Sequence, residues 1–101
     1  RPETEMTNLQ KISPQRAKTL IDSGAVLIDI REGDERARAS IAGSAHMPLS
    51  KIESFKSAPA QTGQIIIYHC KSGNRTAVNA VKLQEKANCE AYILDGGIDA
   101  W

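Results

Sequence analysis

The residue best suited to chemistry in this sequence is Cys70. It follows an apolar run over residues 65–69, which predicts a buried strand, and it precedes a helix expected from about Thr76. The residues between them are polar and include one glycine: Lys71, Ser72, Gly73, Asn74 and Arg75. The pattern therefore predicts a thiol on a tight loop that leads from a strand into a helix.

A loop of this kind favours the thiolate form of a cysteine. Its backbone N–H groups, and those of the first helical turn, have no partners within the helix and can point at the loop centre. Gly73 permits the positive φ that curls these amides into an anion-binding nest, and Lys71 and Arg75 add positive charge. A thiol in such a field ionises more readily than a free cysteine, whose pKa is about 8.5. We therefore expect Cys70 to be a nucleophile beside an anion site, the alternative being a cysteine that fills the core.

The elements that must position this loop follow from the apolar pattern. A helix is expected to begin at Ser13, as the N-cap before Pro14, and to stop at Gly24. Another helix over residues 50–57 is expected to be capped by Ser50. The remaining expected helices cover residues 34–39 and 76–87, and the expected strands or extended segments cover residues 26–30, 43–48, 65–69 and 91–94.

Strands that alternate with helices need crossover connections. The predicted fold class is therefore α/β, a small and mostly parallel sheet flanked by helices on both faces. Binding and catalytic sites in such sheets form at the carboxyl ends of the strands, and Cys70 comes at one of those ends.

Composition narrows the classes of function. The 13 Lys and Arg residues against 12 Asp and Glu give a net charge of +1, which argues against a nucleic-acid partner. No apolar run approaches the roughly 20 residues needed to cross a bilayer. Two cysteines are too few for a secreted disulfide scaffold, so a reducing, cytoplasmic setting is expected.

The expected domain organisation is simple. One domain is predicted over residues 8–101, behind a polar lead-in at residues 1–7. Because the chain starts with Arg1 and stops at Trp101, we expect a domain excised from a longer chain, and a membrane tether beyond Trp101 stays open as an alternative.

Four segments, in order along the chain, resemble the rhodanese (thiosulfate sulfurtransferase) family in its single-domain form. The loop that starts at Cys70 is similar to the family's active-site loop, which has a cysteine, four residues and an arginine followed by Ser or Thr. The other segments are similar to its first, second and closing motifs: Leu-Ile-Asp-Ile-Arg at 27–31, Ile-Ala-Gly-Ser-Ala-His-Met-Pro at 41–48, and Leu-Asp-Gly-Gly-Ile with Ala-Trp within 94–101.

The resemblance has one local departure. After Glu35 the family has an aromatic residue and then Gly-His-Ile, whereas this chain has Arg36, Ala39, Ser40 and Ile41. The departure bears on the packing of this segment and, through Arg36, on the approach to the site, and it does not touch the nucleophile.

The resemblance implies a two-step sulfur transfer. The Cys70 thiolate attacks the outer sulfur of an anionic donor such as thiosulfate and becomes a persulfide, and cyanide or another thiol then removes that sulfur. The amides of residues 71–75 would stabilise the terminal sulfur, and the side chains of Lys71 and Arg75 would hold the donor's sulfonate. For Arg75, bracing of the loop is an equal alternative. No cofactor is expected.

Two other classes of function stay open. Cysteine phosphatases and arsenate reductase-like enzymes use this fold with five residues between cysteine and arginine, where this chain has four. The smaller ring of amides suits a single sulfur better than a tetrahedral oxyanion. The other class is a non-catalytic regulatory or binding module, since a fold alone does not fix a function.

Three further residues receive structural interpretations. Cys89 falls between a helix and a strand, where a small apolar side chain is expected to pack rather than act as a resolving thiol. His46 and His69 lack the spacing of metal ligands, so no metal site is predicted.

The charged stretch after the first predicted strand is also expected to be structural. Asp29 and Arg31 lie on the same side of the strand end, where they are expected to pair with each other or to support the Cys70 loop. The cluster over residues 31–38 is expected to be a solvated face.

Overall fold

The structure is a computed structural model that describes residues 9–61, 63–87 and 90–101. The predicted lead-in at residues 1–7 and Cys89 lie outside these ranges. The described residues form a parallel sheet with the strand order β1-β5-β4-β2-β3. Its strands are β1 (Gln10–Ile12), β2 (Val26–Asp29), β3 (Ala45–His46), β4 (Ile66–His69) and β5 (Ala91–Leu94).

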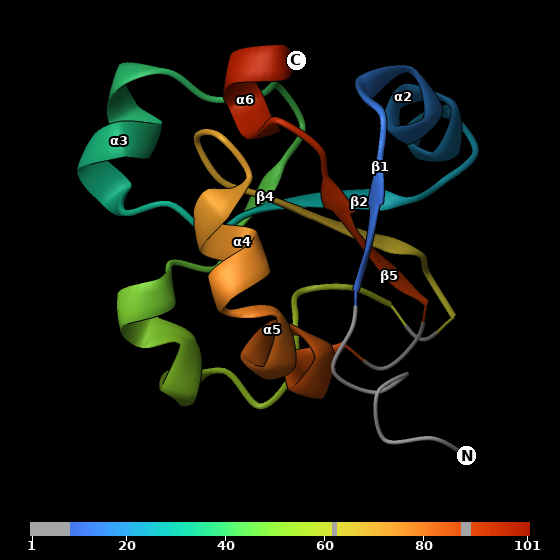
Figure 1. Ribbon diagram of the computed structural model, residues 1–101. Helices are drawn as coiled ribbons and strands as arrows, with labels where there is room; N and C mark the ends of the chain where they lie inside the picture. The colour runs from blue at the N-terminus through green and yellow to red at the C-terminus, as the bar shows by residue number, and fades with distance from the viewer. Residues whose placement is uncertain (1–8, 62, 88–89) are drawn as a thin grey trace.

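Short helices connect these strands. They are α2 (Pro14–Asp22), α3 (Gly33–Arg38), the 3₁₀ helix η1 (Leu49–Ser54), α4 (Asn74–Val78), α5 (Ala80–Lys86) and α6 (Gly97–Ala100). Figure 1 shows α4 and α5 in front of the sheet, with α3 and α6 toward the end where the loop into α4 lies. Within the described ranges, no helix has the length and apolar character that a membrane span requires.

The described residues bury apolar side chains on both faces of the sheet. Side chains alternate along each strand, so neighbouring residues enter opposite layers. On one face Ile28 and Tyr68 join a cluster with Leu83 of α5, and on the other face Leu27 packs in a cluster with Ala17 of α2. The predicted α/β fold with helices on both faces is confirmed.

The predicted start of the first helix is confirmed in detail. Ser13 is the N-cap of α2 and its hydroxyl oxygen accepts the backbone N–H of Arg16 at 3.2 Å, with Pro14 in the first turn. At the other end Gly24 has a φ of +112° and its N–H donates to the carbonyl of Ile21 at 3.0 Å.

The prediction that Ser50 caps a helix over 50–57 is wrong. The 3₁₀ helix η1 begins one residue earlier, at Leu49, with Pro48 in the N-cap position. Ser50 instead donates both its hydroxyl and its backbone N–H to the carboxylate of Glu32. The hydroxyl of Ser50 therefore donates to a carboxylate, which is a strong acceptor, and does not accept a backbone N–H from a first helical turn.

The single helix predicted over residues 76–87 is divided. Helix α4 starts at Asn74, and the regular turn is interrupted at Asn79, which has φ −105° and ψ 21° before α5 begins. The side-chain amide of Asn79 donates to the carbonyl of Arg75 at 2.9 Å. This bond competes with the backbone hydrogen bonds of a continuous helix.

Candidate active site

Cys70 is the first residue after β4, and its side chain lies against the loop that follows. The residue is 1% exposed. Its Sγ accepts the backbone N–H of Gly73 at 3.1 Å and lies 3.9 Å from the hydroxyl of Thr76. That hydroxyl donates to the carbonyl of Gly73 at 2.8 Å. The loop therefore turns back on the thiol and presents a backbone amide to the sulfur.

The turn that brings the loop back to the Cys70 sulfur depends on Gly73. Its φ of +95° lies in the left-handed region, as the sequence predicted, and it serves as the N-cap of α4. A Cβ at this position would lie 3.2 Å from the backbone nitrogen of Gly96. The same residue thus supplies the amide for the sulfur and leaves room for the segment that precedes α6.

Helix α6 fastens the other side of the loop. The backbone N–H groups of Ile98 and Asp99 donate to the carbonyls of Cys70 and Lys71, each at 2.9 Å. Figure 1 shows the loop before α4 lying between α3 and α6. In a trans peptide the N–H points opposite to the C=O, so the amides of Lys71 and Ser72 point away from α6. The contact with α6 therefore orients two further loop amides.

Arg75 of α4 and Glu35 of α3 form a bidentate ion pair. Nη1 and Nη2 of Arg75 donate to Oε1 and Oε2 of Glu35, each at 2.7 Å. The hydrogen bond from Arg75 lowers the pKa of Glu35 to about 2, and Glu35 in turn raises the pKa of Arg75. The guanidinium is therefore held by a neighbouring helix.

This ion pair predicts a particular loss of stability in acid. The pKa of Glu35 is lowered in the folded state, so its contribution is present above the ordinary pKa of 4.5 and fades as the pH falls toward about 2. Arg75 is 37% exposed, so solvent screening limits the contribution to about 1 kcal/mol. Urea unfolding of Glu35→Gln should show that deficit at about pH 6 and a smaller one at about pH 3.

The control for this measurement is Glu85→Gln, which changes an exposed glutamate on α5. It should leave the free energy of unfolding close to that of the unmutated protein at both pH values. A Glu35→Gln deficit that does not shrink in acid would show that the charge of Glu35 is not what stabilises the fold.

The other predicted side chains of the loop do not converge on the thiol. Nζ of Lys71 lies 3.2 Å from the carboxylate of Asp99, and both side chains are exposed. Lys71 lines a pocket of about 220 Å³ next to Arg31, whereas Ser72, Gly73 and Asn74 line a separate pocket of about 300 Å³. The structure therefore brings backbone groups to Cys70, while the cationic side chains of the loop are paired with carboxylates.

A buried charge network lies beneath this end of the sheet. Arg31 donates to both carboxylate oxygens of Asp29, at 3.1 and 3.0 Å, and Arg36 reaches the same carboxylate at 3.3 Å. Burial opposes ionisation of Asp29, but the hydrogen bonds from Arg31 outweigh it and hold the pKa of the carboxyl below its ordinary value. Arg36 also donates to the carbonyl of Ser44 at 2.7 Å.

The predicted pairing of Asp29 and Arg31 is therefore confirmed, and the prediction that residues 31–38 form a solvated face is wrong for part of the cluster. Asp34 and Arg38 are exposed, but Arg31 is buried and Arg36 points inward. The interior carboxylate of Asp29 also attracts Arg36, seven residues away, which sequence spacing does not reveal.

The two histidines also lie at this end of the sheet. The sheet register places His69 of β4 beside Asp29 of β2, and burial lowers the pKa of His69. Its Nδ1 is 3.1 Å from the carbonyl oxygen of Cys70, and Nε2 of His46 is 2.7 Å from the carbonyl of Arg31. In the part of the chain that the structure describes, no cluster of three or more potential metal ligands is found.

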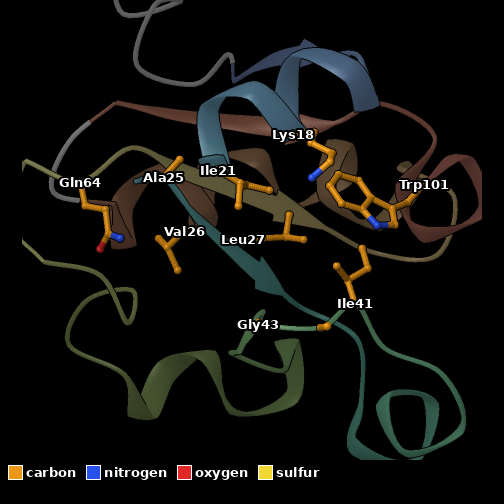
Figure 2. A pocket seen from close by; sticks show the side chains of 10 residues that line it. Lys18, Ile21, Ala25, Val26, Leu27, Ile41, Gly43, Gln64 and Trp101 are labelled. Carbon is orange, nitrogen blue, oxygen red and sulfur yellow. The ribbon is translucent and has the colours of Figure 1, made fainter. Parts of the chain in front are cut away.

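A separate hollow opens on the face that α2 covers. Figure 2 shows Ile21, Leu27 and Ile41 around it, with Lys18 beside the indole of Trp101 at one end. Its volume is about 310 Å³, and no residue of the Cys70 loop lines it. The hollow therefore belongs to the packing of α2 and is not part of the candidate site.

Three residues that shape the site were not among the predicted site residues. Glu35 holds Arg75, Thr76 lies beside the sulfur, and Gly97 allows α6 to approach the loop. The sequence contains a signal for two of them. Thr76 follows the arginine of the loop pattern, and the paired glycines after the last predicted strand indicate a backbone close to another segment. The carboxylate of Glu35 is forty residues from its partner and carries no local signal.

Comparison with known proteins finds relatives that match most of this chain. The family model for the rhodanese-like domain matches residues 13–101. The thiosulfate sulfurtransferase GlpE of Ectopseudomonas mendocina is 34% identical over 96 residues, covering 95% of this chain and 87% of that protein. The GlpE protein of Stutzerimonas stutzeri is 32% identical over the same shares. The solved structure of a rhodanese-related protein from Thermoplasma volcanium is 26% identical, with a TM-score of 0.74 over 91% of this chain and 89% of that one.

Proposed function

The chain belongs to the rhodanese-like domain family, and we propose that it is a thiosulfate sulfurtransferase in which Cys70 carries the sulfur. The observation that supports this most directly is the hydrogen bond from the Gly73 N–H to the sulfur of Cys70, at 3.1 Å. A backbone donor aimed at the thiol stabilises negative charge there. Both a thiolate and a persulfide place negative charge at this position.

The proposed reaction has two balanced steps. The Cys70 thiolate attacks the outer sulfur of thiosulfate, so that a new S–S bond forms to Sγ while the old S–S bond breaks and sulfite leaves with its electron pair. An acceptor then attacks the outer sulfur of the persulfide. Cyanide leaves as thiocyanate, a thiolate acceptor leaves as a persulfide, and Cys70 returns to its thiolate form.

Backbone amides are proposed to do most of the stabilisation. The carbonyls of Cys70 and Lys71 are engaged by α6, so the N–H groups of Lys71 and Ser72 remain directed away from that helix. Together with the N–H of Gly73 they form the ring of donors proposed to hold the outer sulfur. Asn74 and Arg75 begin α4, whose first-turn amides extend this ring.

The donor anion is proposed to approach along the pocket beside Lys71. Three cations line that pocket, Arg31, Arg38 and Lys71, against the carboxylates of Glu35 and Asp99. Lys71 is exposed and its ion pair with Asp99 is weak, so its ammonium group is proposed to turn to the sulfonate of a donor. Arg75 is proposed to brace the loop, because both Nη1 and Nη2 of its guanidinium are bonded to Glu35.

A phosphatase or arsenate reductase activity fits the loop less well. Four residues separate Cys70 from Arg75, and the arginine that would clamp an oxyanion is bonded to a carboxylate. The proposed partners are therefore a small anionic sulfur donor and cyanide or a thiol. A cytoplasmic setting is proposed on the same ground as before, that two cysteines are too few for a secreted disulfide scaffold.

The experiment for this proposal is intact-protein mass spectrometry after incubation with thiosulfate and removal of the excess. We expect a gain of about 32 Da, the mass of one sulfur atom, that disappears on addition of cyanide or a thiol. If neither thiosulfate nor another sulfane-sulfur donor loads the protein under conditions free of reductant, sulfur carriage is wrong, and phosphatase and ligand-binding assays take its place.

A further inference from the structure

One buried side chain beside the loop has no part in the sulfur transfer described above. His69 is fully buried, and its Nε2 is the buried side-chain nitrogen or oxygen, among the described residues, that lacks a hydrogen-bond partner. Asp29 Oδ1 is 3.9 Å away and is already bonded to the backbone and guanidinium of Arg31. An unpaired buried polar atom costs stability, so packing alone does not account for an imidazole here.

The second ring nitrogen fixes the tautomer of His69. Nδ1 is 3.1 Å from the carbonyl oxygen of Cys70, and a carbonyl oxygen only accepts hydrogen bonds. The proton of a neutral ring therefore lies on Nδ1, which donates to Cys70, and Nε2 is a bare lone pair facing Asp29. The imidazole thus makes its hydrogen bond to the backbone of the nucleophile itself.

Two donors meet at this carbonyl. The oxygen of Cys70 accepts from Nδ1 of His69 and, at 2.9 Å, from the backbone N–H of Ile98. The same peptide unit carries the N–H of Lys71 on its opposite side. Donors to a carbonyl polarise the whole unit, which makes its N–H a stronger donor and holds its plane in place.

We infer that His69 is a positioning residue, which acts through the Cys70 carbonyl to orient and polarise the amide of Lys71 and so favours the charged forms of the Cys70 sulfur. For the persulfide form this inference rests on the proposed sulfur transfer. For the thiolate form it rests on the direction of the Lys71 N–H, which points away from α6 because that helix binds the Cys70 carbonyl, and that part is measured without any sulfur donor.

The test compares two substitutions that keep different halves of the ring. The amide nitrogen of His69→Asn takes the place of Nδ1, whereas the amide nitrogen of His69→Gln takes the place of Nε2. Thiolate is followed by its ultraviolet absorbance as a function of pH, with the same variant carrying Cys70→Ser subtracted. The charged groups that face His69, which are Asp29, Arg31 and Arg36, are unchanged in both variants.

We expect His69→Gln to contain about twofold less Cys70 thiolate at neutral pH, because the lost hydrogen bond acts on the sulfur only through the Lys71 amide, and His69→Asn to resemble the unmutated protein. Equal losses in the two variants, or no loss in His69→Gln, would overturn the inference. Rates of sulfur transfer should follow the same order. A thiolate pattern as expected, in a protein that no donor loads, would leave the positioning role standing and refute the proposed function.

A measurement on the unmutated protein covers the case in which a variant does not fold. Nitrogen-15 NMR of the imidazole rings reports which nitrogen carries the proton, and His46→Gln assigns the two histidines. We expect His69 to be protonated at Nδ1 at neutral pH. A ring protonated at Nε2 alone cannot donate to the Cys70 carbonyl and would refute the inference.

Discussion

Cys70→Ser is expected to reduce sulfur transfer to the rate of the uncatalysed reaction while leaving the fold intact. A serine hydroxyl does not ionise near neutral pH and cannot form a persulfide, so the carrier is lost. The oxygen can still accept the N–H of Gly73, which the sulfur accepts at 3.1 Å, so the loop keeps its internal bond. The expected cost to the free energy of unfolding is about 1 kcal/mol. Thiocyanate production and a urea melt measure the two effects.

Cys89→Ser is the matched control for this substitution. Cys89 is the second cysteine of the chain and, from the sequence, is expected to serve as a packing residue. We expect the control to retain nearly full activity and to gain one sulfur from thiosulfate as the unmutated protein does. Transfer that persists in Cys70→Ser, or disappears in Cys89→Ser, would move the sulfur carrier away from the loop.

Gly97→Ala is expected to have the second largest effect. A Cβ at this position would lie 2.4 Å from the carbonyl oxygen of Cys70 and 2.5 Å from that of Lys71, and the φ of +60° adds backbone strain. The strain costs about 1–2 kcal/mol and the overpacking about 1–3 kcal/mol. Since the methyl group can only displace α6 or the loop, we also expect sulfur transfer to fall by about 100-fold.

Gly43→Ala separates strain from collision. Gly43 has a φ of +82°, but a Cβ there meets nothing within 4 Å. We expect this control to have a free energy of unfolding lowered by the cost of the backbone strain alone. Its rate of sulfur transfer should not change. If Gly97→Ala is no worse than Gly43→Ala in both measurements, the close approach of α6 does not maintain the geometry of the loop.

The central strands could be predicted because their sequence is unambiguous. β2, β4 and β5 are short apolar runs buried in the middle of a parallel sheet, and both flanking layers demand apolar side chains there. β1, with the sequence Gln-Lys-Ile, was not predicted as a strand. It lies at the edge of the sheet with two exposed side chains, so it lacks the apolar signal, and its pairing with β5 supplies the hydrogen bonds.

The position and turn of the Cys70 loop could also be predicted, since a buried strand followed by polar residues and Gly73 has few local solutions. The partners of its side chains could not. The local charge suggested that Arg75 and Lys71 hold the donor's sulfonate. In the structure Arg75 is paired with Glu35 and Lys71 with Asp99. Such pairings depend on which helices the fold brings together. The spacing of residues along the chain does not indicate which distant residues lie close in space.

The contact between α6 and the loop also bears on the order in which the protein is made. The donors from Ile98 and Asp99 lie well after Cys70 in the chain, so a ribosome completes the nucleophile before it completes the helix that orients the surrounding amides. Until α6 docks, the carbonyls of Cys70 and Lys71 lack the two backbone donors that orient their peptide units. The arrangement of amides around the thiol is therefore complete only when the last helix of the described chain is in place.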